Sequence, residues 1–154
     1  MATKSRAAPK LDPQHLAAWR AVLGAQARVV RRVERALAEA ELPPLAWYDV
    51  LWALHEADGR RLRIRELSDA VVLSPTGMSR LVDRIEAAGC LRREPVPDDR
   101  RGSYAVLTPE GTALLRRMWP IYEAGIAEHF AEPVGGDAAK LRAPLERVVT
   151  ANEP

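Results

Sequence analysis

Apolar residues recur at every third or fourth position from Leu16 to Leu37 in the N-terminal third of the chain. This spacing predicts a helix that begins at Pro13, with Asp12 as its N-cap, and ends before the proline pair that follows. A chain of 154 residues fits one compact domain. Such a domain cannot cover a helical stripe of about seven turns by itself, so we expect part of this stripe to pack against a partner.

A second apolar pattern predicts long helices in the C-terminal third. One helix is expected over residues 108–130, with Thr108 as its N-cap and a kink at Pro120. A last helix is expected over Asp137–Asn152, interrupted by Pro144. The apolar face of this last helix also exceeds what one small domain covers, so we expect the terminal helices to form a dimer.

Shorter periodic segments between the two apolar stripes predict a lobe that contains both helices and strands. In order, they are a helix at Leu45–Ala57, a strand at Arg60–Ile64, helices at Arg65–Val72 and Ser74–Ala88, and strands at Leu91–Glu94 and Ser103–Leu107 joined by a loop at Pro95–Gly102. A helix-turn-helix followed by a β-hairpin is the plan of a winged helix. The predicted fold class is therefore mainly α with a small β-hairpin (α+β), a winged helix-turn-helix domain flanked by long dimerisation helices.

The predicted organisation is a flexible tail over residues 1–12 and a single domain over 13–154. Within this domain, 13–42 and 109–154 hold the dimerisation helices, and 45–107 forms the winged-helix lobe. Neither an internal repeat nor a low-complexity tract is visible in the sequence.

The second helix of the helix-turn-helix has one apolar face and one polar face. Its predicted core positions are Met78, Leu81, Val82, Ile85 and Ala88, and its opposite face holds Thr76, Ser79, Arg80 and Asp83. Hydroxyl and guanidinium groups approach phosphates and base edges closely, and Gly77 leaves the backbone of the first turn open. A solvated polar face explains the same pattern equally well.

The tip of the predicted hairpin, Pro97 to Gly102, holds two aspartates followed by two arginines. This tip is longer than the two-residue turn of an ordinary hairpin. One Asp–Arg pair can brace the loop while the other arginine reaches a narrow minor groove of DNA. The tip therefore favours a nucleic-acid contact over a solvated face.

Composition and charge narrow the class of protein. The formal net charge is only +2, but residues 60–104 hold ten arginines and no lysine, a bias that suits a polyanionic partner. The sequence has no apolar run of the ~20 residues that a membrane span requires, and no secretory signal. Its single cysteine, Cys90, excludes an internal disulfide and a multi-cysteine zinc site. We expect a cytoplasmic protein without a cofactor or a metal.

Three segments of the sequence resemble the DNA-binding core of MarR-type transcriptional regulators. They are Ile64–Ser68, Leu73–Gly89 and Pro97–Gly102, the last followed by Val106–Gly111. The resemblance covers the chain from about residue 13. The motifs are specific when they are taken together and weak singly.

The resemblance implies that Ser74–Arg84 is a recognition helix, that Asp99 and Arg101 form the Asp-x-Arg pair of the wing, and that Arg100 is a wing-tip contact. The implied DNA-binding residues are Ser74, Thr76, Gly77, Ser79, Arg80, Arg84, Asp99, Arg100 and Arg101. Wings of this family often begin with Asp-Pro, whereas Val96 precedes Pro97 here. The resemblance further implies a homodimer that binds a pseudo-palindromic operator in double-stranded DNA, and a repressor released by a small aromatic or anionic ligand.

Aromatic and polar residues crowd the first two predicted helices, where the family places its effector. The candidate ligand-binding residues are Trp19, Trp47, Tyr48, Asp49, Trp52 and His55. Trp19 and Asp49 resemble residues of the urate-responsive branch of the family. Ordinary core packing of the tryptophans is the competing interpretation.

Other classes of protein fit the sequence less well. No nucleophile motif, phosphate loop or paired His–carboxylate spacing indicates an enzyme. The main alternative is a winged-helix module, or an anti-regulator, that binds a protein and no longer binds DNA. Arginines at 80, 84, 100 and 101 argue against this alternative, because such a module has little use for them. We interpret Cys90 as a small apolar residue of the core.

Overall fold

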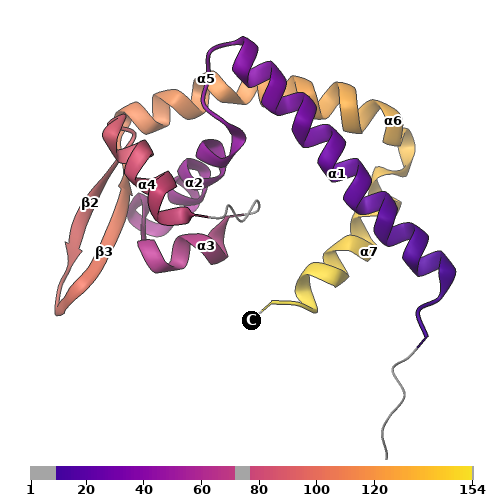
Figure 1. Cartoon of the computed structure of the whole chain (residues 1–154), viewed down its shortest axis with the longest axis horizontal. Coiled ribbons are helices and arrows are strands. Elements are labelled where there is room, and N and C mark those ends of the chain that lie inside the picture. Colours follow the sequence, from indigo (N-terminus) through magenta and orange to yellow (C-terminus); the bar gives the residue numbers. More distant parts are fainter. Residues whose placement is uncertain (1–9, 72–76, 154) are drawn as a thin grey trace, which may run out of the picture.

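The computed structural model describes residues 10–71 and 77–153, whose elements form an arch (Figure 1). The helices and strands are α1 (Pro13–Glu39), α2 (Leu45–Glu56), β1 (Arg61–Arg63), α3 (Leu67–Ala70), α4 (Met78–Ala87), β2 (Leu91–Val96), β3 (Asp99–Leu107), α5 (Pro109–Ile126), α6 (Glu132–Val134) and α7 (Ala138–Thr150). The strands form one antiparallel sheet in the order β1-β3-β2. The predicted fold class, a mainly helical winged helix-turn-helix with a small hairpin, is confirmed.

One core joins the winged-helix lobe to the long helices. It contains Leu45, Val50, Leu51 and Leu54 of α2, Leu67 of α3, Leu81, Val82 and Ile85 of α4, and Leu114, Leu115 and Met118 of α5. α5 extends from the lobe across the top of the arch and crosses α1 (Figure 1). At this crossing a Cβ on Gly125 would lie 2.7 Å from Cγ2 of Val33, so glycine is needed for the two helices to approach so closely.

The first residues of α5 are fixed to the end of α4. The Thr108 hydroxyl donates to the carbonyl oxygen of Gly89 at 2.6 Å and accepts from the Gly111 N–H at 3.1 Å. The Thr108 N–H donates to the carbonyl oxygen of Cys90 at 3.3 Å. A Cβ on Gly111 would lie 2.1 Å from that oxygen, too close for any other residue to replace this glycine without a backbone shift. The Cys90 side chain is buried beside this junction, as interpreted, and burial raises the pKa of its thiol.

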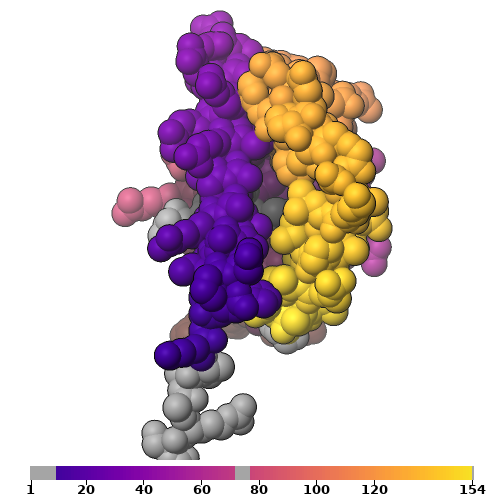
Figure 2. Space-filling view, turned by 90° about the vertical axis from the view of Figure 1, so that its right-hand side faces the viewer, coloured from indigo at the N-terminus to yellow at the C-terminus, as the bar shows by residue number. Residues whose placement is uncertain are grey.

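The apolar stripes of the terminal helices are largely uncovered. α1 buries only Val33 and Leu37 near its C-terminal end, whereas Trp19 is 55% exposed and Leu23 48% exposed. No residue of α7 is buried, and Val149 is 63% exposed. Figure 2 views the end of the molecule where α1 and the C-terminal segment occupy the same face. A single chain therefore leaves an extended apolar surface in solvent.

Several predicted boundaries are wrong. The predicted helix at Arg65–Val72 is limited to α3 and follows a 3₁₀ turn at Ile64–Glu66, where the Glu66 carboxylate accepts from the Arg63 N–H at 3.2 Å. α4 begins at Met78 and not at Ser74, because Gly77 has a φ of 85°, which no right-handed helix contains. The predicted cap at Ser74 and Pro75 lies outside the described residues.

The wing is longer and its turn tighter than predicted. β2 and β3 pair as far as Val96 and Asp99, so that only Pro97 and Asp98 connect them, and Asp98 has a φ of 64°. The register shifts after Pro95, which pairs with Ser103, and the three residues from Arg100 to Gly102 bulge from β3. The extra length assigned to a loop is therefore a bulge within a strand.

The prolines of the C-terminal helices do not break them. α5 remains helical through Pro120, and the irregular turn comes later, a π turn at Ala127–Ala131. α7 continues through Pro144, contrary to the predicted interruption. Because α7 is exposed, water satisfies the carbonyl that a proline leaves unpaired.

Candidate functional site

The polar face of α4 is exposed along its whole length. Ser79, Arg80, Asp83 and Arg84 are exposed, while Leu81, Val82 and Ile85 are buried beneath them. Ala88, predicted as a core residue, is exposed because the helix ends there. Two residues of the predicted DNA-binding set, Ser74 and Thr76, lie outside the described residues.

Gly77 caps α4 in the left-handed conformation. Apart from the chain neighbours of Gly77, no heavy atom of the described residues lies within 4 Å of the position that a Cβ would occupy. The glycine is therefore needed for its backbone angles and not for a close approach within the chain. Its exposed backbone stands at the N-terminal end of the polar face of α4.

The wing is braced by Asp99. Its Oδ1 accepts from the backbone N–H of Arg101 at 3.1 Å, and its Oδ2 lies 3.6 Å from Nη1 of Arg63 in β1. The expected Asp99–Arg101 pair forms through the main chain of Arg101, and Arg63 takes the other carboxylate oxygen, while no ion pair of the Arg101 guanidinium occurs among the described residues. A Cβ on Gly102 would lie 2.4 Å from Oδ2, so the bulge closes over the carboxylate only with glycine at that position.

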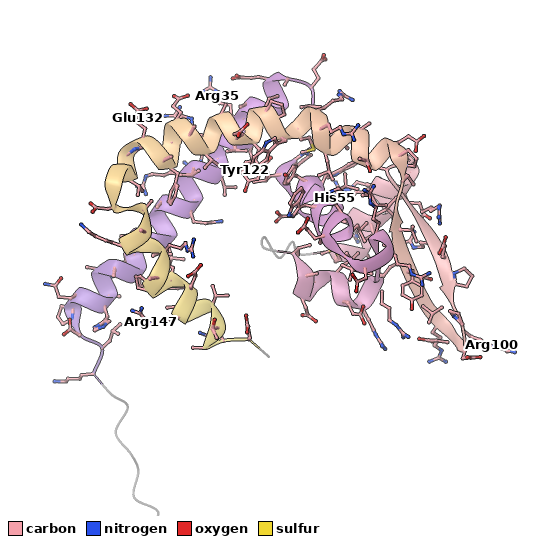
Figure 3. All side chains as sticks on the ribbon, turned by 180° about the vertical axis from the view of Figure 1, so that it is seen from behind. Arg35, His55, Arg100, Tyr122, Glu132 and Arg147 are labelled. Carbon is pink, nitrogen blue, oxygen red and sulfur yellow. The ribbon has the colours of Figure 1, made fainter. Side chains whose placement is uncertain are left out.

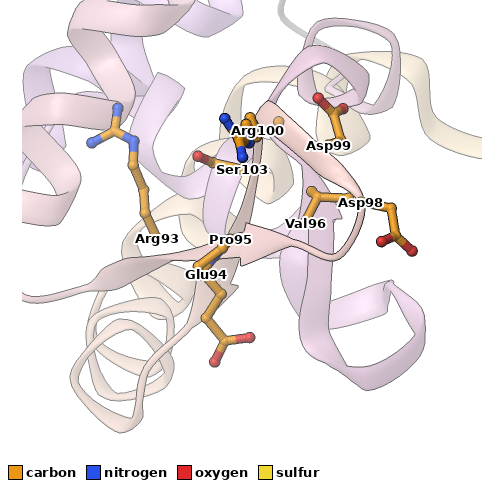
Figure 4. Close-up of a pocket in the computed structure, with 9 residues that line it drawn as sticks. Arg93, Glu94, Pro95, Val96, Asp98, Asp99, Arg100 and Ser103 are labelled. Atoms are coloured by element: carbon orange, nitrogen blue, oxygen red, sulfur yellow. The ribbon is translucent and has the colours of Figure 1, made fainter.

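Arg100 and Arg101 at the wing tip are exposed, and Arg100 lines a shallow hollow of about 620 Å³ together with Arg93. In Figure 4 the guanidinium groups of Arg93 and Arg100 lie on the same side of the hairpin as Ser103, while Glu94 and Asp98 point away. Figure 3 shows Arg100 at the far end of the wing. The wing thus presents cationic and anionic side chains in different directions.

The arginines of α4, of the wing and of the segment before α3 differ in whether they pair with a carboxylate. Arg63, Arg92 and Arg93 each pair with a carboxylate. Within the described part of the chain, no ion pair involves Arg65, Arg80, Arg84, Arg100 or Arg101. The unpaired guanidinium groups lie on the exposed face of α4, in the turn before α3 and at the wing tip. This surface therefore keeps uncompensated positive charge.

A second feature is a cavity of about 940 Å³ between α1, α2 and α5. Tyr48 lines the cavity and contacts three other aromatic rings. The centroid of its ring lies 6.0 Å from that of Trp52, 6.2 Å from that of Trp119 and 5.1 Å from that of Tyr122. Tyr122 and His55 lie on the inner side of the arch (Figure 3). The cavity is apolar and aromatic on most of its wall.

The chain is similar in sequence and in fold to known regulatory proteins. The model of the MarR family matches residues 42–102, from α2 to the wing. The crystal structure of Sco3205 from Streptomyces coelicolor, a MarR family transcriptional regulator in complex with DNA, has a TM-score of 0.77 and 29% identity over 93% of this chain and 90% of that chain. These matches support a winged-helix regulator of the MarR family.

Other relatives match parts of the chain or its fold. PecS of Dickeya dadantii, an HTH-type transcriptional regulator, is 35% identical over 86 residues, 54% of this chain and 50% of PecS. The chain spans about half the length of the curated relatives that it matches. BpsR of Bordetella bronchiseptica, whose DNA binding 6-hydroxynicotinic acid regulates, has a TM-score of 0.69 at 22% identity over 96% of this chain and 99% of that chain. This last likeness is one of fold.

The structure brings together four of the six predicted ligand-binding residues. Tyr48, Asp49, Trp52 and His55 line the cavity. Trp19 and Trp47 do not line it: Trp19 lies on the exposed half of α1, and Trp47 packs against the core. Sequence reasoning missed the residues that come from other segments, namely Arg60, Arg116, Trp119 and Tyr122.

Polar groups of the cavity favour a ligand with both a ring and a charge. Arg60 and Arg116 supply two guanidinium groups, and the buried Nδ1 of His55 has no hydrogen-bond partner among the described residues. Burial raises the pKa values of Tyr48 and Tyr122, so both stay protonated near neutral pH and can donate hydrogen bonds. Arg60 has a φ of 54°, unusual for a residue with a side chain.

Residues 10–71 and 77–153 contain no group of three or more His, Cys, Asp or Glu side chains placed to hold a metal ion. None of the helices they form is long and apolar enough to cross a bilayer.

Replacing Asp99 with alanine is expected to loosen the wing tip. The variant removes the acceptor of the Arg101 N–H and the partner of Arg63, so amide exchange at residues 99–103 should become at least about tenfold faster, since a lost hydrogen bond of about 1.5 kcal/mol changes a rate tenfold. Hydrogen-exchange mass spectrometry or NMR measures this rate. Asp98→Asn is the control, because it removes the same charge and asparagine tolerates positive φ. Equal exchange in both variants would contradict the brace.

Proposed function

We propose that the chain is a sequence-specific DNA-binding transcriptional regulator. The observation that carries the proposal is the set of unpaired arginines on the exposed face of α4 and at the wing tip. Structural ion pairs neutralise the neighbouring arginines, so a solvated surface does not explain why these four stay unpaired. DNA phosphates and base edges are the partners that such an arrangement fits.

In this proposal α4 enters the major groove and the wing contacts the minor groove. Ser79 and Arg80 lie near the N-terminal end of α4, where a recognition helix contacts base edges. Arg100 and Arg101 at the wing tip fit the negative potential of a narrow minor groove. Asp99 has a bracing role and no direct contact with DNA. Ser74, Thr76, Gly77 and Arg84 complete the proposed surface.

We further propose that two copies bind DNA together. The exposed apolar residues of α1 and α7 share one face of the chain, and a second copy covers such a face in a two-fold symmetric dimer. Two α4 helices then reach successive major grooves, with half-sites about 10 base pairs apart in a pseudo-palindromic operator. The regulator acts as a repressor in this proposal.

The effector of this repressor is proposed to be a small aromatic anion. The stacked rings around Tyr48 suit a planar ligand, and Arg60 and Arg116 suit its carboxylate. The cavity lies beside α1 and α5, the helices that connect the lobe to the proposed dimer interface. A ligand that changes the packing of these helices alters the spacing of the two α4 helices and releases DNA.

Arg80→Ala is expected to weaken binding to the cognate duplex by about 1–3 kcal/mol and to relax preference at one base position. The cognate duplex is first selected from a random library with the wild-type protein. Affinities for this duplex and for a scrambled duplex are then measured at several salt concentrations. Arg31→Ala, an exposed arginine of α1, removes the same charge and should have little effect.

Two outcomes would change this assignment. An equal loss on both duplexes would make Arg80 a phosphate contact. A wild-type protein that selects no DNA and shows no salt-dependent binding would refute DNA binding and leave the protein-interaction module.

Trp19→Glu is expected to convert a wild-type dimer into a monomer, because it places a charge in the uncovered apolar face of α1. Ala17→Glu adds the same charge to the opposite face of the helix and should leave the dimer intact. Light scattering after size exclusion gives the mass of each variant. A monomeric wild type, or dimers of all three proteins, would count against the proposed interface.

Aromatic acids are expected to quench the fluorescence of Trp52 and Trp119 and to release the cognate duplex. The probes are salicylate and 6-hydroxynicotinic acid. Arg116→Met should weaken their binding about tenfold or more, since a hydrogen bond to a charged group contributes about 1.5–3 kcal/mol. Arg117→Met is the control, because Arg117 is exposed and does not line the cavity. Equal affinity in the two variants would remove Arg116 from the site.

A further inference from the structure

Arg93 joins the base of the wing to α4. It is the third residue of β2, and its side chain extends back over α4. Its Nη2 donates to Oδ1 of Asp83 at 2.6 Å, and its Nη1 donates to Oε2 of Glu86. The Arg93 backbone N–H donates to the other oxygen of Glu86 at 3.2 Å. Three hydrogen bonds therefore connect one residue of the wing with two residues of α4.

We propose that Arg93 is a positioning residue that sets the angle between the wing and α4, with Asp83 and Glu86 as its fixed acceptors. The proposal rests on the proposed DNA binding, because it assigns Arg93 to the alignment of the two parts that contact DNA. Arg93 itself has no direct contact with DNA in this proposal.

The geometry at the base of the wing supports this role. β2 begins two residues after Gly89, whose φ of 75° turns the chain sharply away from α4. Beyond this turn the hairpin projects from the lobe (Figure 1). β1 pairs only with Tyr104–Val106 of β3, so the outer part of the wing is a two-stranded ribbon, which has little stability of its own. Contacts close to the base, such as those of Arg93, therefore control where the tip lies.

Asp83 and Glu86 are correctly placed for this function. They are three residues apart and so lie on one side of α4. The planar guanidinium presents separate N–H groups to the two carboxylates, which fixes direction as well as distance. Glu86 also holds the main chain of β2, so the contact orients the strand and not only the side chain of Arg93.

The charges lead to the same inference. Asp83 is a carboxylate with 62% of its side chain exposed, on the face of α4 that we propose contacts DNA. Such a carboxylate repels phosphates unless a cation compensates it. Arg93 supplies that cation, and its hydrogen bond to Asp83 raises the pKa of the guanidinium further. Exposed ion pairs add little stability, so stability alone does not account for an acidic residue at this position.

Asp83→Asn and Glu86→Gln test the proposal, since electrostatics and positioning predict opposite results for them. Loss of a negative charge near DNA alone would tighten binding. Loss of positioning should weaken binding to the selected cognate duplex about tenfold and leave binding to the scrambled duplex unchanged or slightly tighter. Arg93→Lys keeps the charge but not the forked contact, so it should show a similar loss of cognate binding.

Glu94→Gln is the matched control. Glu94 is the next residue of β2, and its carboxylate pairs with Arg61 and Arg92, both within the sheet. This variant removes the same charge from the wing without affecting α4, so it should not reduce cognate affinity. Thermal unfolding of every variant checks that the fold is retained.

A second measurement works without DNA. Amide exchange at residues 91–96 should become several-fold faster in Asp83→Asn and Glu86→Gln, and stay at the wild-type rate in Glu94→Gln. Cognate binding that is unchanged or tighter in Asp83→Asn would overturn the positioning role. If the wild-type chain binds no DNA, the proposed function fails. Separately, wild-type exchange rates in both Asp83→Asn and Glu86→Gln would show that the contacts of Arg93 do not constrain the wing.

Discussion

The arrangement of this molecule depends on the packing of Gly111 against the Cys90 carbonyl. At this point α4 has just ended, β2 is beginning, β3 has just ended and α5 is beginning. The Thr108 hydroxyl and the Cys90 carbonyl connect these four chain ends by hydrogen bonds. The wing therefore leaves and rejoins the core at one place, and α5 departs from α4 in a fixed direction. The separation of the two α4 helices in a dimer follows from that direction.

Local signals in the sequence predicted the parts of the fold that depend on neighbouring residues. Asp12 and Pro13 begin α1, Thr108 and Pro109 begin α5, and Gly89 ends α4, as expected from their capping chemistry. The wing was assigned too short because Pro, Asp, Arg and Gly are typical of loops. Cross-strand pairing with β2 decides its length instead, and a single-segment pattern does not contain that information.

In the candidate sites, too, the sequence predicted what neighbouring residues determine and missed what depends on contacts between distant segments. The exposed face of α4 was predictable from helical spacing, and four residues of the cavity wall were predictable because they are neighbours on α2. Trp119 and Tyr122 were identified only as apolar positions of a long helix, since spacing shows which residues face inward but not which helix they face. The partner of Asp99 was missed for a related reason. Arg63 lies 36 positions earlier in the chain and reaches Asp99 through the sheet.

The short segment from Arg60 to Arg63 connects the cavity with the wing. The side chain of Arg60 lines the cavity, and the next residue, Arg61, begins the strand that pairs with β3 at Val106. Two positions further on, Arg63 holds Asp99 at the wing tip. The left-handed angles of Arg60 cost about 1 kcal/mol or more, and they persist only while its surroundings enforce them. A change in the backbone angles of this one residue would therefore displace β1 and, through Arg63, the wing tip.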